Sequence, residues 1–146
     1  MSVEIRVLGE NDAAVLDNVS AGVFDFAIDP DMARRFLADP AHHIVVALDE
    51  GIVVGMASGN DYLHPDKPVS FWVNEMGVAP THQRRGIGKQ LLRRILDLAE
   101  SLGREEVWLG SVVDYVAARE LFRSLDGEVE SFVLYTYMLG DKGKAE

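Results

Sequence analysis

A group of basic residues surrounds two glycines in the middle of an acidic chain. The segment QRRGIGK, residues 83–89, places Arg84, Arg85 and Lys89 around Gly86 and Gly88, although the formal net charge of the chain is −10. Glycines let a backbone turn tightly, and the first amides of a following helix lack intrahelical partners and carry the positive end of the helix dipole. With charge-assisted hydrogen bonds from the basic side chains, these amides predict a site for a diphosphate group.

Two familiar phosphate-binding loops do not match this segment. A Walker loop needs a glycine at position 83 and Ser or Thr at position 90, but both residues are glutamine. A dinucleotide-binding fingerprint needs a third glycine at position 91, which is Leu91. The segment is therefore interpreted as a phosphate site of another type.

Hydrophobic periodicity predicts the elements that position this site. Residues 69–78 are interpreted as a strand, and the apolar residues from Ile87 to Leu102 recur every three or four positions, which predicts a helix ended by Gly103. Two strands meeting at a turn over 49–51 indicate a hairpin. The other predicted elements are strands over 3–8, 106–113 and 129–139, and helices over 11–19, 29–39 and 115–125.

This order, β-α-α-β-β-β-α-β-α-β, predicts an α+β (mixed α/β) fold with helices on both faces of the sheet. We expect one domain over residues 1–140, with 141–146 as a frayed tail. The last predicted strand has room for one long strand or a cramped pair. A partner chain could complete the sheet there, so a homodimer is a further expectation.

Composition limits the classes of function. The chain has no cysteine, a pI near 4.8, no signal-peptide pattern and no apolar run long enough to span a membrane. We therefore expect a cytoplasmic protein that binds neither membrane nor nucleic acid, because polyanions are repelled by an acidic surface. His42 and His43 point to opposite faces of a strand, and His64 and His82 lie in separate loops, so no metal site is expected.

The pattern Gln/Arg-x-x-Gly-x-Gly/Ala, present as Gln83 to Gly88 after MGVAP and before ARELFRSLDG, resembles the GNAT superfamily of N-acetyltransferases. The resemblance covers most of the chain, and FWVNEMGVAPTHQRRGIGKQLL is similar to the aminoglycoside 3-N-acetyltransferase branch. It implies a mostly antiparallel sheet of six to seven strands and acetyl-CoA as cosubstrate. The implied cofactor-binding residues are the backbone of Met76, Gly77 and Val78 along the pantetheine arm, and Gln83, Arg84, Arg85, Gly86, Ile87, Gly88 and Lys89 around the pyrophosphate. Gly77 fits a close approach of the arm, which favours a missing side chain.

The resemblance also suggests catalytic residues. Glu75 is the candidate base that gives a neutral amine, directly or through a water, and the Val78 amide would face the thioester oxygen. Glu75 could instead be an exposed strand carboxylate or attract the amine electrostatically. Relatives often carry a tyrosine acid where this chain has Phe122, so Tyr115 is the candidate acid, with Tyr135 and Tyr137 as alternatives.

The expected acceptor is the primary amine of a small cationic molecule, aminoglycoside-like or polyamine-like, with a protein or peptide amine as an alternative. Carboxylates in the segments that would face it could attract such an amine or could be ordinary surface charge. These are Asp25, Asp29, Asp31, Glu75, Glu128 and Glu130. A non-catalytic acyl-CoA-binding or sensor module is the alternative function, because Phe122 cannot donate a proton.

Overall fold

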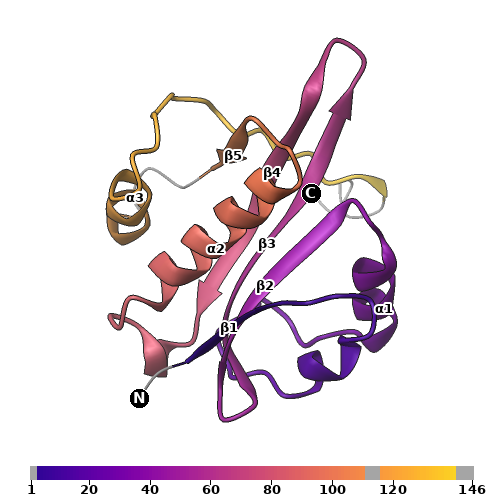
Figure 1. The fold of residues 1–146 in the computed structure, drawn as a ribbon, viewed down its shortest axis with the longest axis vertical. Helices are drawn as coiled ribbons and strands as arrows, with labels where there is room; N and C mark the ends of the chain where they lie inside the picture. The colour runs from indigo at the N-terminus through magenta and orange to yellow at the C-terminus, as the bar shows by residue number, and fades with distance from the viewer. Residues whose placement is uncertain (1–2, 111–115, 141–146) are drawn as a thin grey trace.

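A computed structural model describes residues 3–110 and 116–140 of the chain, and Figure 1 shows their arrangement. The strands are β1 (Glu4–Val7), β2 (His42–Asp49), β3 (Ile52–His64), β4 (Lys67–Val78) and β5 (Val107–Leu109). The helices are α1 (Pro30–Ala38), α2 (Ile87–Ser101) and α3 (Val116–Arg123), with two short 3₁₀ helices, η1 (Ala13–Asp17) and η2 (Pro80–His82).

The five strands form one sheet in the order β1-β2-β3-β4-β5. The first four are antiparallel neighbours, whereas β5 is parallel to β4 because α2 carries the chain back along the sheet between them. The mixed α+β fold class predicted from the sequence is confirmed, and so are the hairpin of β2 and β3 and the order of the elements around α2.

Both faces of the sheet are covered. Residues 44–48 of β2 and 53–57 of β3 are buried without interruption, which requires packing on each side. Gly55 faces α2, because a Cβ there would lie 2.9 Å from Leu91 Cδ1. Gly77 faces the opposite side, where a Cβ would lie 2.2 Å from the carbonyl oxygen of Val23. The loop of residues 18–28 therefore covers the face that α2 does not.

Helix α2 follows the predicted apolar spacing closely. Its buried residues, Ile87, Leu91, Leu92, Ile95 and Ala99, form one stripe against β2 and β3, while its charged residues face solvent. Gly86 begins the helix with φ at 78°, and Gly103 follows its end with φ at 80°. Both glycines have the left-handed conformation that other residues rarely adopt.

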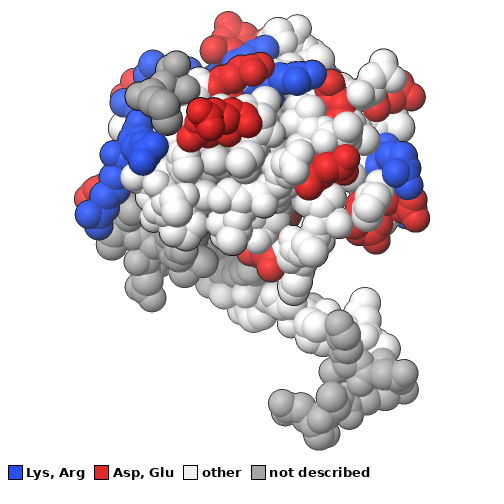
Figure 2. Space-filling model, turned by 90° about the horizontal axis from the view of Figure 1, so that it is seen from below, with Lys and Arg blue, Asp and Glu red and all other residues white. Residues whose placement is uncertain are grey.

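Two expected elements differ from the structure. The helix predicted over 11–19 is only the 3₁₀ helix η1, because its backbone leaves helical geometry at Asn18 and pairs with β3 through Val19. The strand predicted over 129–139 is not formed, so the described sheet has five strands rather than six to seven. Alternating apolar residues satisfy the strand pattern there, but a strand also needs a hydrogen-bonded neighbour, and none of the described strands pairs with this segment. Figure 2 shows the side chains of the described residues from the lower end of the molecule.

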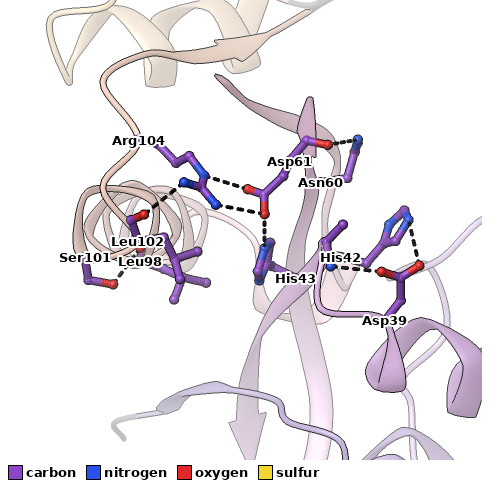
Figure 3. A network of polar contacts seen from close by, with 10 residues as sticks. Asp39, His42, His43, Asn60, Asp61, Leu98, Ser101, Leu102 and Arg104 are labelled. Atoms are coloured by element: carbon purple, nitrogen blue, oxygen red, sulfur yellow. Dashed lines mark hydrogen bonds and ion pairs between the residues drawn. The ribbon is translucent and has the colours of Figure 1, made fainter. Parts of the chain in front are cut away.

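A polar network fixes the chain between α2 and β5 against the sheet (Figure 3). Arg104 donates from Nε and Nη2 to the two carboxylate oxygens of Asp61, at 2.9 and 3.2 Å, and His43 Nε2 lies 3.4 Å from the same carboxylate. The His43 ring stacks on Phe71, with 5.4 Å between ring centroids. Two residues after Arg104, the carbonyl of Glu106 accepts the N–H of Phe71, so the network sets where β5 begins.

The Asp61 carboxylate is held in its ionised form by this network. Partial burial alone would raise its pKa, but hydrogen bonds from Arg104 and His43 outweigh that effect, and the pKa of Asp61 is lowered.

None of the helices in the part of the chain described above is long and apolar enough to cross a membrane.

We expect Asp61→Asn to lower the free energy of unfolding by about 1–3 kcal/mol at pH 7, because an amide N–H₂ would face the donors of Arg104 and His43. A lowered folded-state pKa means that the carboxylate adds stability above its unfolded pKa of about 3.9 and loses it as the pH falls through the folded pKa. Urea unfolding should therefore show the difference from wild type shrinking below about pH 4.

The control for this experiment is Asp97→Asn on α2. Asp97 is exposed and makes no hydrogen bond or ion pair with the described residues, so its replacement should leave stability unchanged at every pH. A difference between wild type and the Asp61 variant that persists undiminished at pH 3 would contradict the assignment of an ionised Asp61.

Candidate functional site

The far half of β4 has a free edge. β4 pairs with β3 as far as Val78, which lies opposite Gly55, but it pairs with β5 only over Phe71 to Val73. Beyond Val73, no other strand in the described part of the chain lies on that side of β4. The backbone of residues 74–78 therefore has hydrogen-bonding groups available along one edge.

A bulge at Asn74 separates the paired and free parts of this edge. Val73 lies opposite Gly59 and Glu75 opposite Ser58, so Asn74 is an extra residue on β4. Further along, Ala79 donates its N–H to Val54 on β3 at 2.8 Å. Since successive N–H groups of a strand point to opposite edges, the N–H groups of Val78 and Met76 point to the free edge.

Gly77 lies between Met76 and Val78. The group nearest to the position of its missing side chain differs from the one expected. The sequence analysis attributed this glycine to close approach of a bound molecule. In the structure a Cβ at Gly77 would meet the carbonyl oxygen of Val23, at 2.2 Å, so the protein's own loop is a sufficient reason for the glycine, and close approach of a bound molecule stays a prediction. The missing side chain makes room for the protein's own loop.

The segment from Gln83 to Gly86 is exposed and leads into the N-terminus of α2. Arg84 and Gly86 both have positive φ, 64° and 78°, so the backbone turns sharply twice before the helix. Among the described residues no side chain caps the helix start, and the first turn of the helix has no acidic residue. The amides of Ile87, Gly88 and Lys89 are thus left for an anion, in the manner of a backbone nest.

The glycine segment and the free edge of β4 meet at one place. Gln83 Nε2 donates to the carbonyl of Val78 at 3.2 Å, and a Cβ on Gly88 would lie 3.9 Å from Val78 Cγ2 and 3.4 Å from Leu121 of α3. Figure 2 looks at this end of the molecule and shows basic side chains mainly along its left edge and acidic ones mostly elsewhere. The predicted cofactor-binding residues on β4 and on the loop therefore border a single site.

Glu75 lies on the other face of the same strand. Side chains two residues apart in a strand share a face, so Glu75 projects with Gly77 toward the loop of residues 18–28. Its carboxylate is exposed and makes no hydrogen bond or ion pair with the described residues. A base at Glu75 would lie next to Met76, whose N–H points to the free edge, and its carboxylate would be accessible to an incoming substrate.

Of the candidate acids, the structure describes only Tyr135 and Tyr137, besides Phe122 at the position where relatives often carry a tyrosine. Tyr115 lies outside the described residues. Phe122 is partly buried and packs against the core, so it contributes apolar contact at that position. Tyr135 and Tyr137 are 74% and 79% exposed in the C-terminal segment, which forms no helix or strand.

Two of the carboxylates expected to attract an acceptor have structural partners within α1. Asp29 caps α1 by accepting the N–H groups of Asp31 and Met32 at 2.9 and 3.2 Å, and Asp31 pairs with Arg34. Glu128 and Glu130 lie in the exposed C-terminal segment. Within residues 3–110 and 116–140 no group of three or more His, Asp or Glu side chains is arranged to hold a metal ion.

An open cleft of about 530 Å³ lies within the loop that faces Glu75's side of the sheet. Its exposed lining is about as polar as it is apolar. Phe24, Phe26 and Ile28 contribute apolar side chains, and Asp17 and Asp25 are its acidic members. None of the sequence patterns above predicts this cleft. The signal was the apolar run VFDFAI, residues 23–28, in a segment without a helix or strand pattern.

Comparisons with known proteins agree with this architecture. The model of the acetyltransferase (GNAT) family matches residues 15–126. The N-alpha-acetyltransferase RimI of Mycobacterium tuberculosis is 37% identical over 125 residues, covering 84% of this chain and 77% of the relative. The chain covers about half of other curated relatives, among them the L-methionine sulfoximine/L-methionine sulfone acetyltransferase of Salmonella typhimurium, with 31% identity and 64% of this chain against 53% of the relative.

A solved structure shares the fold. An aminoglycoside acetyltransferase from an uncultured soil metagenomic sample, in complex with sisomicin, superposes with a TM-score of 0.80 at 24% identity, covering 94% of this chain and 97% of that one. This likeness extends over the sheet and its helices, and it shows that the five described strands belong to the expected architecture.

Proposed function

The chain belongs to the acetyltransferase (GNAT) family, and we propose that it moves an acetyl group from acetyl-CoA directly onto a primary amine. One observation carries the proposal most strongly: the free edge of β4 meets the uncapped start of α2 beside Val78. A linear donor with amide groups at one end and a pyrophosphate at the other matches such a pair of neighbouring features.

In this proposal β4 and the glycine loop hold the two parts of the donor. The pantetheine arm of acetyl-CoA lies along Met76 to Val78 like a short extra strand, using the amides that point to the free edge. The pyrophosphate lies over the first amides of α2, with Arg84, Arg85 and Lys89 adding charge. The left-handed backbone at Arg84 and Gly86 supports this, because it turns the chain before the helix begins.

The reaction needs a neutral amine, a stabilised oxyanion and a protonated leaving group. Glu75 accepts the amine proton, directly or through a water, and the amine nitrogen then bonds to the thioester carbonyl carbon. The N–H of Val78 stabilises the negative oxygen of the tetrahedral intermediate. As the carbon–sulfur bond breaks, the thiolate takes a proton, for which Tyr115 stays the candidate donor, and the positively charged nitrogen releases its extra proton to solvent, which leaves the neutral amide.

For the acceptor, we favour the α-amine of an amino acid or peptide over a polycation. Asp29 and Asp31 have structural partners, and the cleft beside Glu75's face of the sheet combines apolar side chains with few carboxylates, which suits an acceptor with one charge and an uncharged body. The most extensive curated match above is an N-alpha-acetyltransferase. The small polycationic acceptor expected from the sequence is the second candidate, supported by exposed Glu75 and Asp25.

A panel of amines tests this proposal through thiol release from acetyl-CoA. It contains a peptide with a free N-terminus, single amino acids, spermidine and an aminoglycoside, with an N-acetylated peptide as the blank. We expect the highest kcat/KM for a peptide or amino acid. Preference for spermidine or the aminoglycoside would reverse the choice of acceptor, and tight CoA binding without turnover of any amine would favour a non-catalytic module.

We expect the double variant Arg84→Ala/Gly86→Ala to raise the Kd for CoA by about tenfold to a hundredfold, since one charge-assisted hydrogen bond is worth about 1.5–3 kcal/mol. Isothermal titration calorimetry measures this effect. The matched control is Arg94→Ala/Gly103→Ala, which removes one arginine from the middle of α2 and the left-handed glycine that follows its end. Equal affinity in the two double variants would disprove the phosphate site.

We expect Glu75→Gln to lower kcat at neutral pH by about 100-fold without changing the KM for acetyl-CoA, because the amide cannot accept the amine proton. The acidic limb of the pH–rate profile should disappear in this variant. Asp25→Asn serves as the control carboxylate on the same side and should retain that limb. A Glu75 variant with an unaltered pH–rate profile would exclude it as the base.

A further inference from the structure

The turn η2 carries a histidine that reaches across to a distant hairpin. His82 Nε2 lies 2.7 Å from Asp49 Oδ2, and its Nδ1 lies 2.8 Å from the hydroxyl of Thr81. The side chains of His82 and Asp49 are only 16% and 19% exposed, although His82 ends η2 and Asp49 ends β2. The hydrogen bond therefore joins the ends of two elements 33 residues apart in the sequence, in surroundings where solvent competes little.

Asp49 is a fixed point in the structure. It ends β2 opposite Ile52, and the two residues between them, Glu50 and Gly51, have φ of 50° and 81°. Two left-handed residues in a two-residue connection make a tight hairpin whose twist matches its strands. The carboxylate is thus held by the paired strands β2 and β3 at the centre of the sheet.

His82, in contrast, immediately precedes the glycine segment. Its N–H donates to the carbonyl of Ala79 at 2.8 Å, and Ala79 in turn is hydrogen-bonded to β3. On the other side of η2, Pro80 packs under the loop of residues 18–28, where a Cβ on Gly22 would lie 2.7 Å from Pro80 Cδ. The turn is consequently held from several directions before the chain reaches Gln83.

Residues 84–86 have no comparable support from side chains. They are exposed, and the described residues provide no side-chain cap at the start of α2. Two of the three have left-handed backbone, a conformation that persists when the flanking structure determines it. The constraint has to come from the two ends of the segment, which are α2 on one side and η2 with His82 on the other.

We propose that Asp49 and His82 form a positioning pair that holds the glycine segment ready for the pyrophosphate of CoA. The pair acts through the direction in which the chain leaves η2, and neither side chain contacts the donor. The inference rests on the proposed function, because it assigns a role in donor binding. A phosphate site made of backbone amides depends on such preorganisation, since a displacement of about 1 Å costs much of the interaction.

The test compares Asp49→Ala, Asp49→Asn and His82→Ala with wild type in CoA binding and steady-state kinetics. We expect the two alanine variants to raise the Kd for CoA and the KM for acetyl-CoA by about tenfold, with kcat at saturating donor within about twofold of wild type. The side-chain amide oxygen in the Asp49→Asn variant would still accept a hydrogen bond, so this variant should keep the Kd within about threefold. The double alanine variant should bind no more weakly than either single alanine variant, as expected for a pair that acts together.

The matched control is Asp66→Ala, which breaks the His64–Asp66 pair at the β3–β4 turn, at the opposite end of β3. Its Kd for CoA should equal that of wild type. Unchanged CoA affinity in both alanine variants, an equal loss in the Asp66 variant, or additive losses in the double variant would overturn the inference. If wild-type protein itself does not bind CoA, the proposed function fails instead. If Asp49→Ala does not fold, His82→Ala and Asp49→Asn decide the question.

Discussion

The site depends on one edge of β4 that, in the described part of the chain, has no strand partner beyond Val73. The backbone groups of a strand need hydrogen-bonding partners, and those of β4 pair with β5 only as far as Val73. The bulge at Asn74 and the parallel start of β5 leave the remaining edge open while β3 holds the opposite edge along its length. The loop of residues 79–86, which connects β4 to α2, lies at the end of this free edge. One bound molecule can therefore accept hydrogen bonds from the backbone amides of both β4 and the start of α2.

The Arg104–Asp61–His43 network and the Asp49–His82 pair maintain this opening from opposite ends of the sheet. The first fixes where β5 begins beside Phe71, and the second fixes where the chain leaves η2. Each consists of charged or polar side chains that are mostly shielded from solvent and fully partnered. Such groups contribute directional constraint in addition to stability, because their hydrogen bonds are satisfied in only one arrangement.

Much of this architecture was predictable from the sequence, for identifiable reasons. The apolar spacing from Ile87 onward and the flanking glycines determine α2 locally, and the fold class and family inferred from them are confirmed. The roles assigned to Glu75 and the glycine loop stay predictions. Other features depend on contacts between distant segments and could not be predicted from periodicity. The residues around the bulge at Asn74 have the sequence pattern of a regular strand, and no periodic pattern indicates the Asp49–His82 hydrogen bond. The strand expected over 129–139 had the right pattern but lacks a pairing partner in the structure.

The contact between Gly77 and Val23 links the two halves of the site in a way that matters for engineering. Because the carbonyl of Val23 lies where a side chain at position 77 would be, the loop of residues 18–28 cannot be replaced independently of β4. A transplanted loop whose backbone lay at a different distance from β4 would need a different residue at position 77, and a larger residue at that position would displace the present loop. Specificity in this scaffold therefore has to be redesigned as a loop together with the strand residue beneath it.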